Sequence, residues 1–247
     1  MFRNEAEFTR VQQQHFNHAD AKHFYWTTGG AGFSDVEDEL LAPLLETIVA
    51  PCVEIGCGEG NNLVRLRRRA ACVGVDLFPA KLAFAATHVP GARFVAADAR
   101  ALPFSDGYFK TVFIRDLLHH VHSPAGVVAE AVRVLAVGGC LCLLEPNGWN
   151  PIVRLQTYLV PAERRARESG PAQIARLLST LPLTAIEVRT AQPLPLRRMI
   201  LHYRFGLPIL GRLSVSRRAL IGLERFAGRF IPSSLWAYVA ATARRVG

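Results

Sequence analysis

One short segment constrains this chain more than any other: an apolar run leads directly into three alternating glycines and then into a helical stretch. The segment is Val53 to Asn62, VEIGCGEGNN. Glycine adopts positive φ at little cost and lets a ligand approach the backbone, because no Cβ stands in the way. The N-terminus of the helix that follows offers unpaired N–H groups. We therefore predict a ligand-binding loop at the end of a buried strand.

Short apolar runs alternate with helical stretches from residue 51 onward. Apolar strands separated by helices are typical of a parallel sheet that is buried on both faces and joined by right-handed crossovers. The pattern predicts an α/β fold with a seven-stranded, mostly parallel sheet flanked by helices, and the segment 197–234 is expected to form inserted helices. The strands are expected at 52–56, 72–76, 92–98, 108–115, 139–146, 184–191 and 235–245, and the helices between them at 60–70, 79–88 and 124–136.

The N-terminal residues 1–50 are expected to be helical, because apolar side chains recur there at steps of three and four residues. Within this region, residues 23–34 are aromatic and rich in glycine and are predicted to form a loop, with Asp35 as a cap of the next helix. The aromatic cluster Phe24-Tyr25-Trp26 is predicted to close over the ligand site as a lid that excludes water.

Acidic residues mark three successive strand ends around the glycine loop: Glu54, Asp76 and Asp98. A dinucleotide-binding turn would carry glycine at position 61, which is Asn here. A carboxylate such as Glu54 inside an apolar strand needs a partner, which a ligand ammonium or the N–H groups of the loop would supply. Asp76 can accept hydrogen bonds from a ribose, and Asp98 from a purine amine; the alternatives are a helix cap at Asp76 and a loop cap at Asp98. The preferred ligand carries an ammonium, a ribose and a purine amine, which describes S-adenosylmethionine.

Four motifs in order resemble the core of the class I S-adenosylmethionine-dependent methyltransferases, of the type that acts on small molecules. They are VEIGCGEG, VGVD, FVAADARALPFSDGYFKTVFIRDLLHHV and RVLAVGGCLCLLEPN, within residues 51–146. Val137-Gly138-Gly139 stands where the family often has Pro-Gly-Gly. The resemblance implies a Rossmann-like sheet, S-adenosylmethionine as the cofactor and methyl transfer as the activity.

The resemblance also implies a role for each matching residue. Glu54 would support the glycine loop and the methionine amine, and Asp76 would bind the ribose. Leu77 would pack against the adenine, and Asp98 would bind its amine beside the backbone of Ala99. The loop residues that would approach the cofactor are Gly56, Cys57, Gly58 and Gly60, and Arg115 would contribute only its backbone carbonyl, since a cationic side chain is no ligand for an ammonium.

Methyl transfer asks little of a protein beyond aligning the reactants and excluding water, because the sulfonium is already activated. His119 and His120 would frame the site below the methyl group and are candidate general bases, with structural hydrogen bonding as the alternative. Glu145 is predicted to point toward the same crevice as a base or an orienting carboxylate, unless it caps the next loop. The spacing H-H-x-H up to His122 spreads the histidines around a helix start, so no metal site is predicted.

Charge is unevenly distributed along the chain. Residues 1–150 hold 13 Lys and Arg against 16 Asp and Glu, whereas residues 151–247 hold 16 Arg against 4 Glu. Residues 215–230 combine an apolar stripe with an arginine-bearing face, as a basic amphipathic helix does. Either the stripe packs on the core, or the region 197–230 contacts an anionic membrane surface and presents a lipid-like acceptor. Nucleic acid is an unfavoured partner, because the arginines lack interleaved aromatics for stacking on bases.

We predict a single methyltransferase domain over residues 1–247, with an N-terminal helical lid (1–50), a cofactor-binding core (51–146) and a C-terminal part (147–247) that carries a basic helical cap at about 197–234. The five cysteines form no CxxC pair, which favours reduced thiols in the cytoplasm, and a peripheral position at the membrane is a further expectation. The acceptor is expected to be small and apolar or lipid-like; the sequence defines neither its reacting atom nor the oligomeric state. The rival hypotheses are a nicotinamide-dependent oxidoreductase and a non-catalytic binding protein built on a methyltransferase core.

Overall fold

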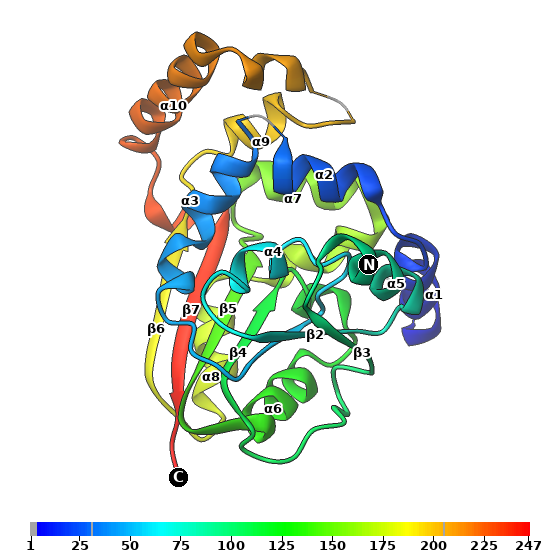
Figure 1. Ribbon diagram of the computed structural model, residues 1–247. Coiled ribbons are helices and arrows are strands. Elements are labelled where there is room, and N and C mark those ends of the chain that lie inside the picture. The colour runs from blue at the N-terminus through cyan, green and yellow to red at the C-terminus, as the bar shows by residue number, and fades with distance from the viewer. Residues whose placement is uncertain (1–3, 31, 205) are drawn as a thin grey trace.

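The computed structural model describes residues 4–30, 32–204 and 206–247, so the expected lid segment includes four residues outside the described ranges and the expected cap segment includes one. A seven-stranded sheet with the order β3-β2-β1-β4-β5-β7-β6 runs through the centre (Figure 1). The first five strands in this order pair in parallel, and β7 is antiparallel to both of its neighbours. The strands are β1 (Cys52–Ile55), β2 (Cys72–Asp76), β3 (Arg93–Ala96), β4 (Phe109–Arg115), β5 (Leu135–Pro146), β6 (Leu183–Ala191) and β7 (Tyr238–Arg245).

Helices cover both faces of this sheet and also lie over the carboxyl ends of its strands, at the top in Figure 1. Those before β5 are α1 (Glu5–Phe16), α2 (Ala21–Gly29), α3 (Ser34–Leu45), α4 (Leu63–Leu66), α5 (Pro79–His88), η1 (Leu118–His120) and α6 (Pro124–Val134). Those after it are α7 (Pro151–Leu159), η2 (Pro161–Glu168), α8 (Pro171–Ser179), α9 (Leu196–Ile200), η3 (Pro208–Arg212), α10 (Ser214–Gly228) and η4 (Ser233–Leu235). The η segments are 3₁₀ helices.

Two hydrophobic clusters hold the layers together, one on each face of the sheet. The first contains Leu41 of α3, Leu63 of α4 and Leu82 of α5. The second contains Val128 of α6 and Leu178 of α8. Because the central strands are buried on both faces, their sequences are continuously apolar rather than alternating. This confirms the predicted seven-stranded, mostly parallel, Rossmann-like sheet.

Several local predictions need correction. Residues 23–34 are not a loop, since α2 covers residues up to Gly29; the Asp20 side chain accepts a hydrogen bond from the His23 N–H and so caps this helix. Asp35 is not a cap, because α3 already begins at Ser34 and has no side-chain cap. The helix expected at 60–70 is reduced to the single turn α4, and the helices α7, η2 and α8 were not predicted.

The segments above the carboxyl ends of the strands come from distant parts of the chain. In Figure 1, α2, α7 and α9 gather over this edge of the sheet, and α10 lies beyond α9 at the periphery. Trp26 of α2 connects two of these segments, because its indole N–H donates to the Leu201 carbonyl at 2.7 Å and its ring stacks on Phe33.

Candidate functional site

A cavity of about 1050 Å³ opens at the carboxyl ends of β1, β2 and β4. The sheet order reverses between β1 and β4, and open α/β sheets bind ligands at such a switch point. Three of the predicted site residues, Glu54, Gly60 and Glu145, are not among the lining residues. Those that do line the cavity are Gly56, Cys57, Gly58, Asp76, Leu77, Asp98, Ala99, Arg115, His119 and His120.

The glycine loop has the geometry that its sequence predicts. Gly56, Gly58 and Gly60 all have positive φ, at 78°, 52° and 82°. A Cβ on Gly56 would meet Leu117 at 2.9 Å and one on Gly60 would meet Val89 at 3.0 Å, so these two glycines are needed for packing. A Cβ on Gly58 would meet only the Lys81 Nζ, at 3.9 Å. The backbone of Gly58 is therefore open toward the cavity, as a close approach by a ligand requires.

Asp76, at the end of β2, holds the loop and faces the cavity at the same time. Its carboxylate accepts from the Gly58 N–H at 2.8 Å and from the Phe78 N–H at 2.9 Å. Burial raises the pKa of this carboxyl, against the opposing effect of those hydrogen bonds and of Lys81. The next residue, Leu77, lines the cavity with a 54% exposed side chain. An apolar surface thus lies directly beside the carboxylate.

Asp98 and Ala99 lie on the rim of the same cavity. The Asp98 carboxylate accepts from the Arg100 N–H at 2.8 Å and pairs with the Arg100 guanidinium at 2.7 Å. This hydrogen bond to Arg100 lowers the pKa of Asp98. The loop cap that we considered as an alternative is therefore present, and it leaves the carboxylate at the cavity.

Glu54 is completely buried beneath the loop. Its Oε1 accepts from the Asn62 amide at 2.6 Å, so the expectation that the loop N–H groups would be its partner is wrong. Its Oε2 has no hydrogen-bond partner within the described ranges. Burial raises the pKa of this carboxyl to about 8. A buried acid with a free oxygen at this place fits a cationic group on a ligand.

Arg115 joins this site to the layers above it. Its side chain donates to Asn62 Oδ1 at 2.9 Å and pairs with Glu37 of α3 at 2.6 Å. Glu37 also pairs with Arg198 of α9 at 2.5 Å. Burial alone would raise the pKa of Glu37, and the two guanidinium groups overcome it and lower the pKa to about 2. The arginine side chain thus has a definite place in the structure, whereas the sequence had suggested a use only for its backbone.

The three residues of the predicted aromatic lid lie in different surroundings. Trp26 lines the cavity, Phe24 is buried against Phe84, and Tyr25 is 57% exposed and hydrogen-bonded to His88. The helix that carries them does touch the glycine loop, because the Asp20 N–H donates to Glu59 at 2.9 Å.

A second polar group lies in the same cavity, around η1 and η2. His119 and His120 do not spread apart as predicted: their ring centroids are 3.8 Å apart, and both rings reach Glu163. Only His122 points elsewhere, toward Glu5. Glu145 is fully buried outside the cavity lining, so the prediction that it points into the crevice is wrong; it accepts from His119 Nδ1 at 2.7 Å.

The electrostatics of this group are set by burial and by its carboxylates. Burial lowers the pKa of His119, but Glu145 and Glu163 outweigh it and raise the value to about 10. Burial, helped by the charge on His119, lowers the pKa of His120 to about 3. Burial raises the pKa of Glu163, and the two histidines reverse this and lower it to about 2.

Sequence reasoning missed Glu37, Asn62, Glu163 and Arg198. Asn62 belongs to the glycine-loop motif VEIGCGEGNN, and the polar pair that follows its third glycine was an available signal. Glu163 is the first acid in the otherwise basic run PAERRARE. Nothing in its local pattern indicates that η2 folds back onto η1.

The residues present fit S-adenosylmethionine. The open backbone at Gly58 and the carboxylate of Asp76 beside Leu77 match a ribose and an adenine, whereas the free oxygen of Glu54 lies beneath the loop and does not line the cavity. A cavity of this kind at the switch point defines a nucleoside-binding α/β protein. The model of the methyltransferase domain family matches residues 53–143.

Curated relatives agree with this family match. A trans-aconitate 2-methyltransferase from Variovorax paradoxus is 30% identical over 84% of this chain and 82% of its own. The chain belongs to the class I S-adenosylmethionine-dependent methyltransferases. The chloroplastic tocopherol O-methyltransferase of Arabidopsis thaliana is 33% identical over 46% of this chain and 33% of its own. For three curated relatives the aligned part covers 33–48% of the relative's length, so this chain spans about half of them or less.

Solved structures share the fold. The geranyl diphosphate C-methyltransferase of Streptomyces coelicolor, solved with Mg²⁺, geranyl diphosphate and S-adenosylhomocysteine, superposes with a TM-score of 0.64. It covers 97% of this chain and 98% of its own at 18% identity. Within the described ranges, no helix has the length and apolar character needed to cross a membrane.

Proposed function

We propose that this protein transfers the methyl group of S-adenosylmethionine to a small acceptor that is apolar or lipid-like. The observation that carries the proposal is that one cavity of about 1050 Å³ contains both the glycine loop with Asp76 and the His119–His120 group. The volume exceeds the usual size of a site for one small ligand, which supports a cofactor and an acceptor bound side by side.

The cofactor supplies a sulfonium whose methyl carbon is open to nucleophilic attack. In our proposal Gly56, Cys57, Gly58 and Gly60 form its cradle, and the Arg115 carbonyl and Glu54 serve the methionine amine, with Asn62 orienting Glu54. Asp76 would bind the ribose hydroxyls. Leu77 would pack on the adenine, and Asp98 with the Ala99 backbone would bind its amine.

In the transfer step the carbon–sulfur bond breaks as a bond forms between the acceptor atom and the methyl carbon. The chain's own contribution is alignment and exclusion of water. His119 and His120 would form the wall at the acceptor end, and the imidazole of His120, which its lowered pKa keeps neutral, would be the one to take the acceptor's proton. Glu145 would act through His119, because its carboxylate holds the His119 Nδ1 and accepts from the N–H groups of Leu117 and Leu118.

Apolar side chains line the acceptor end of the cavity among polar ones such as Gln12 and Gln156, and this apolar surface supports the proposed acceptor class. Relatives with lipid-like acceptors in their names, such as the tocopherol enzyme, support it further, whereas the trans-aconitate enzyme acts on a small acid. The apolar side chains at this end come from α1, α7 and α9; they are Phe8, Phe16, Ile152, Val153, Leu155, Leu159 and Met199.

We also propose that α10 and its flanks contact an anionic membrane surface from the cytoplasm. Much of the apolar stripe of α10 and of the residues that follow it is exposed: Val215 is 77% exposed, Phe226 58% and Phe230 73%. Within the described ranges, Leu220 alone of this stripe packs against the cluster of Trp26, Phe33 and Leu201. Exposed arginines accompany this stripe, namely Arg212, Arg218, Arg225 and Arg229. Exposed apolar residues bordered by basic ones are the composition that binds anionic interfaces.

A transfer assay tests the proposed activity. The full chain is incubated with methyl-labelled S-adenosylmethionine and with organic and aqueous extracts of the same cells. Label should enter the organic fraction with the native protein and not with Gly58→Val. Label in the aqueous fraction alone would refute the acceptor class. Binding of S-adenosylhomocysteine without transfer to either fraction would favour the non-catalytic binding protein, and binding of NADH instead would favour the oxidoreductase.

A further inference from the structure

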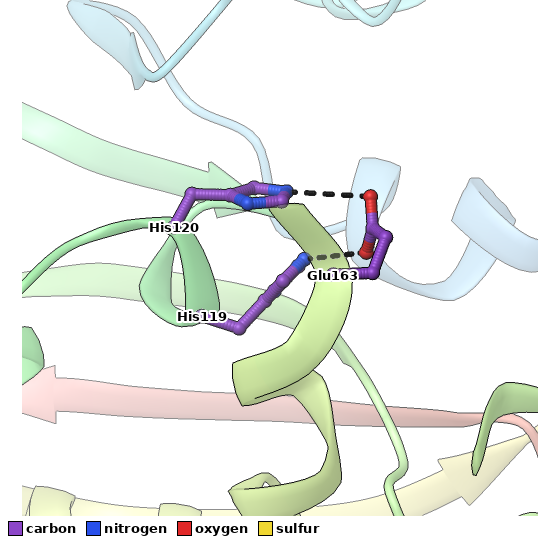
Figure 2. A group of neighbouring side chains, drawn as sticks. All are labelled: His119, His120 and Glu163. Atoms are coloured by element: carbon purple, nitrogen blue, oxygen red, sulfur yellow. Dashed lines mark hydrogen bonds and ion pairs between the residues drawn. The ribbon is translucent and has the colours of Figure 1, made fainter. Parts of the chain in front are cut away.

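The side chains of His119, His120 and Glu163 converge on one point at the cavity wall (Figure 2). Their ligand atoms all lie within 4.8 Å of one another. His119 Nε2 is 3.2 Å from Glu163 Oε2, and His120 Nε2 is 3.7 Å from Glu163 Oε1. Metal–ligand bonds of about 2.0–2.2 Å leave neighbouring ligand atoms about 3.4 Å apart in a tetrahedral site. The two distances to Glu163 are close to this spacing, and the two histidine ligand atoms lie within 4.8 Å of each other, so small adjustments would let all three groups bind one ion.

Glu145 prepares His119 for this role. Its Oε2 is 2.7 Å from His119 Nδ1, and its Oε1 accepts from the N–H groups of Leu117 and Leu118 at 2.8 Å each. When Nδ1–H donates to this carboxylate, the lone pair of Nε2 points at Glu163. A carboxylate behind a metal-binding histidine has the same effect in known sites, where it fixes the tautomer and raises the basicity of the ligand.

His119 lies between the carboxylates of Glu145 and Glu163, so positive charge is favoured where the three side chains converge. Glu163 has ion pairs with His119 and His120, and Lys81, which lines the same cavity, is paired with Glu59 at 3.3 Å. The side chain of Glu163 is 20% exposed and that of His120 12%, so the point of convergence is reached from the cavity. Either a proton shared within the cluster or a bound cation satisfies the facing acceptor atoms.

We propose that this cluster binds one divalent transition-metal ion, such as Zn²⁺, through His119 Nε2, His120 Nε2 and a Glu163 oxygen. Two imidazoles and one carboxylate favour such ions over Mg²⁺ and Ca²⁺, which prefer oxygen ligands alone. Three protein ligands leave a coordination position open toward the cavity. If the proposed methyl transfer is right, that position would hold an oxygen atom of the acceptor.

Calorimetric titration of the full chain with Zn²⁺ tests the site without using activity. One equivalent should bind to the native protein, and Mg²⁺ at the same concentration should not. Glu163→Gln and His120→Ala should lose this binding, and the matched control His122→Ala should keep it. Glu145→Gln should weaken it by about 10- to 100-fold, as expected of a residue that positions a ligand.

Binding of S-adenosylhomocysteine by each variant shows whether the variant is folded, and it separates a failure of the metal site from a failure of the proposed function. A Co²⁺-substituted native protein should also show the visible absorption of a low-coordinate site, which Glu163→Gln should remove. If the native protein binds no Zn²⁺, or if Glu163→Gln and His120→Ala bind it as tightly as the native protein, the proposal is overturned and a shared proton holds the cluster together.

Discussion

Helices α6 and α10 are both amphipathic, but α6 packs on the protein with its apolar face, whereas α10 packs mainly with its charged face. In α6 the apolar side chains, including Val127, Val128 and Ala131, are completely buried against the sheet. In α10 most of the apolar stripe faces outward, although Leu220 packs against the cluster of Trp26, Phe33 and Leu201, and Glu224 is the one buried residue of the helix among those described. The inward face of α10 is held by ion pairs, from Arg197 to Glu224 at 2.5 Å and from Arg217 to Asp35 at 3.5 Å.

The two helices therefore depend on different forces. Burial of apolar surface stabilises the packing of α6 by about 25 cal/mol for each Å² buried. This force is non-directional, so it does not fix the orientation of the helix. Of the two ion pairs on α10, only Arg197–Glu224 is buried, since the side chains of Arg217 and Asp35 are 40% and 52% exposed. A buried ion pair contributes little net stability because both charges are desolvated, but breaking it is costly, so it fixes orientation. The core is thus built for stability, whereas α10 is held in one orientation with its apolar surface free to contact a partner.

The largest expected effect is on the free energy of unfolding, and it is seen by making the same Leu-to-Ala truncation at a buried and at an exposed position. Leu141→Ala, at a fully buried position of β5, should lower the free energy of unfolding by about 2–5 kcal/mol. Leu223→Ala, at a 51% exposed position of α10, should change it by no more than about 0.5 kcal/mol. Urea unfolding measures both. A large loss in Leu223→Ala would mean that the stripe is buried in solution.

The second prediction concerns the acid sensitivity of the charged layer. The pKa of Glu37 is lowered to about 2, so the stability it contributes is fully present above the ordinary value of 4.5 and is lost as the pH falls toward 2. The shift corresponds to about 3 kcal/mol. Unfolding followed between pH 6 and pH 2 should show this loss.

The control for this titration is Asp38→Asn, whose side chain is 55% exposed and lies next to Glu37 in α3. It should leave the acid limb of the profile unchanged. Glu37→Gln should flatten that limb, at the cost of lower stability at pH 6 because two buried guanidinium groups lose their partner. An unchanged limb in Glu37→Gln would assign the acid sensitivity to other carboxyls.

The third prediction separates the two functions of Asp76. Asp76→Ala should weaken S-adenosylhomocysteine binding by about 1.5–3 kcal/mol, since hydrogen bonds from the ligand and from Gly58 are both lost. Asp98→Ala, at the exposed rim, should cost less, because Arg100 already occupies its carboxylate. Calorimetry with both variants ranks the two acids; equal losses would contradict the difference seen in their surroundings.

The smallest expected effect is on the binding of α10 to anionic vesicles. Arg218→Gln should weaken binding to anionic vesicles by about 1 kcal/mol at low salt, which is the contribution of one arginine near a charged surface. High salt should release the native protein, as screening shortens the range of the field. Vesicle sedimentation measures this, and Arg217→Gln should matter less because Arg217 pairs with Asp35. Equal binding to neutral and anionic vesicles would argue against the proposed contact.

Much of the core could be predicted from the sequence because local pattern and tertiary position agree there. The strand at 52–56 is apolar and ends in glycines, and the helix at 79–88 begins at a proline, so each segment carries its own boundary. The same reasoning identified Asp76 and the glycine loop, whereas Leu77 followed only from the family resemblance. It placed Glu145 wrongly, because a strand end does not reveal whether its side chain points into the crevice or behind it.

The orientation of α10 could not be predicted for a physical reason. An amphipathic pattern defines two faces of a helix but not which face meets the protein, and here ion pairs to Arg197 and Asp35 from other segments decide it. Glu163 was missed for a similar reason, since it reaches His119 only through the fold of η2. Residues whose role depends on a distant partner carry no local signal.

Cofactor binding by a matched pair of glycine variants tests the central role of the glycine loop most directly. Gly58→Val and Gly138→Val both place a branched side chain at positive φ, where a Cβ has open space around it. Calorimetric titration with S-adenosylhomocysteine should give one site per chain in the native protein and in Gly138→Val, and no binding in folded Gly58→Val. Undiminished binding in Gly58→Val, or binding of NADH in place of S-adenosylhomocysteine by the native protein, would contradict the assignment of this loop.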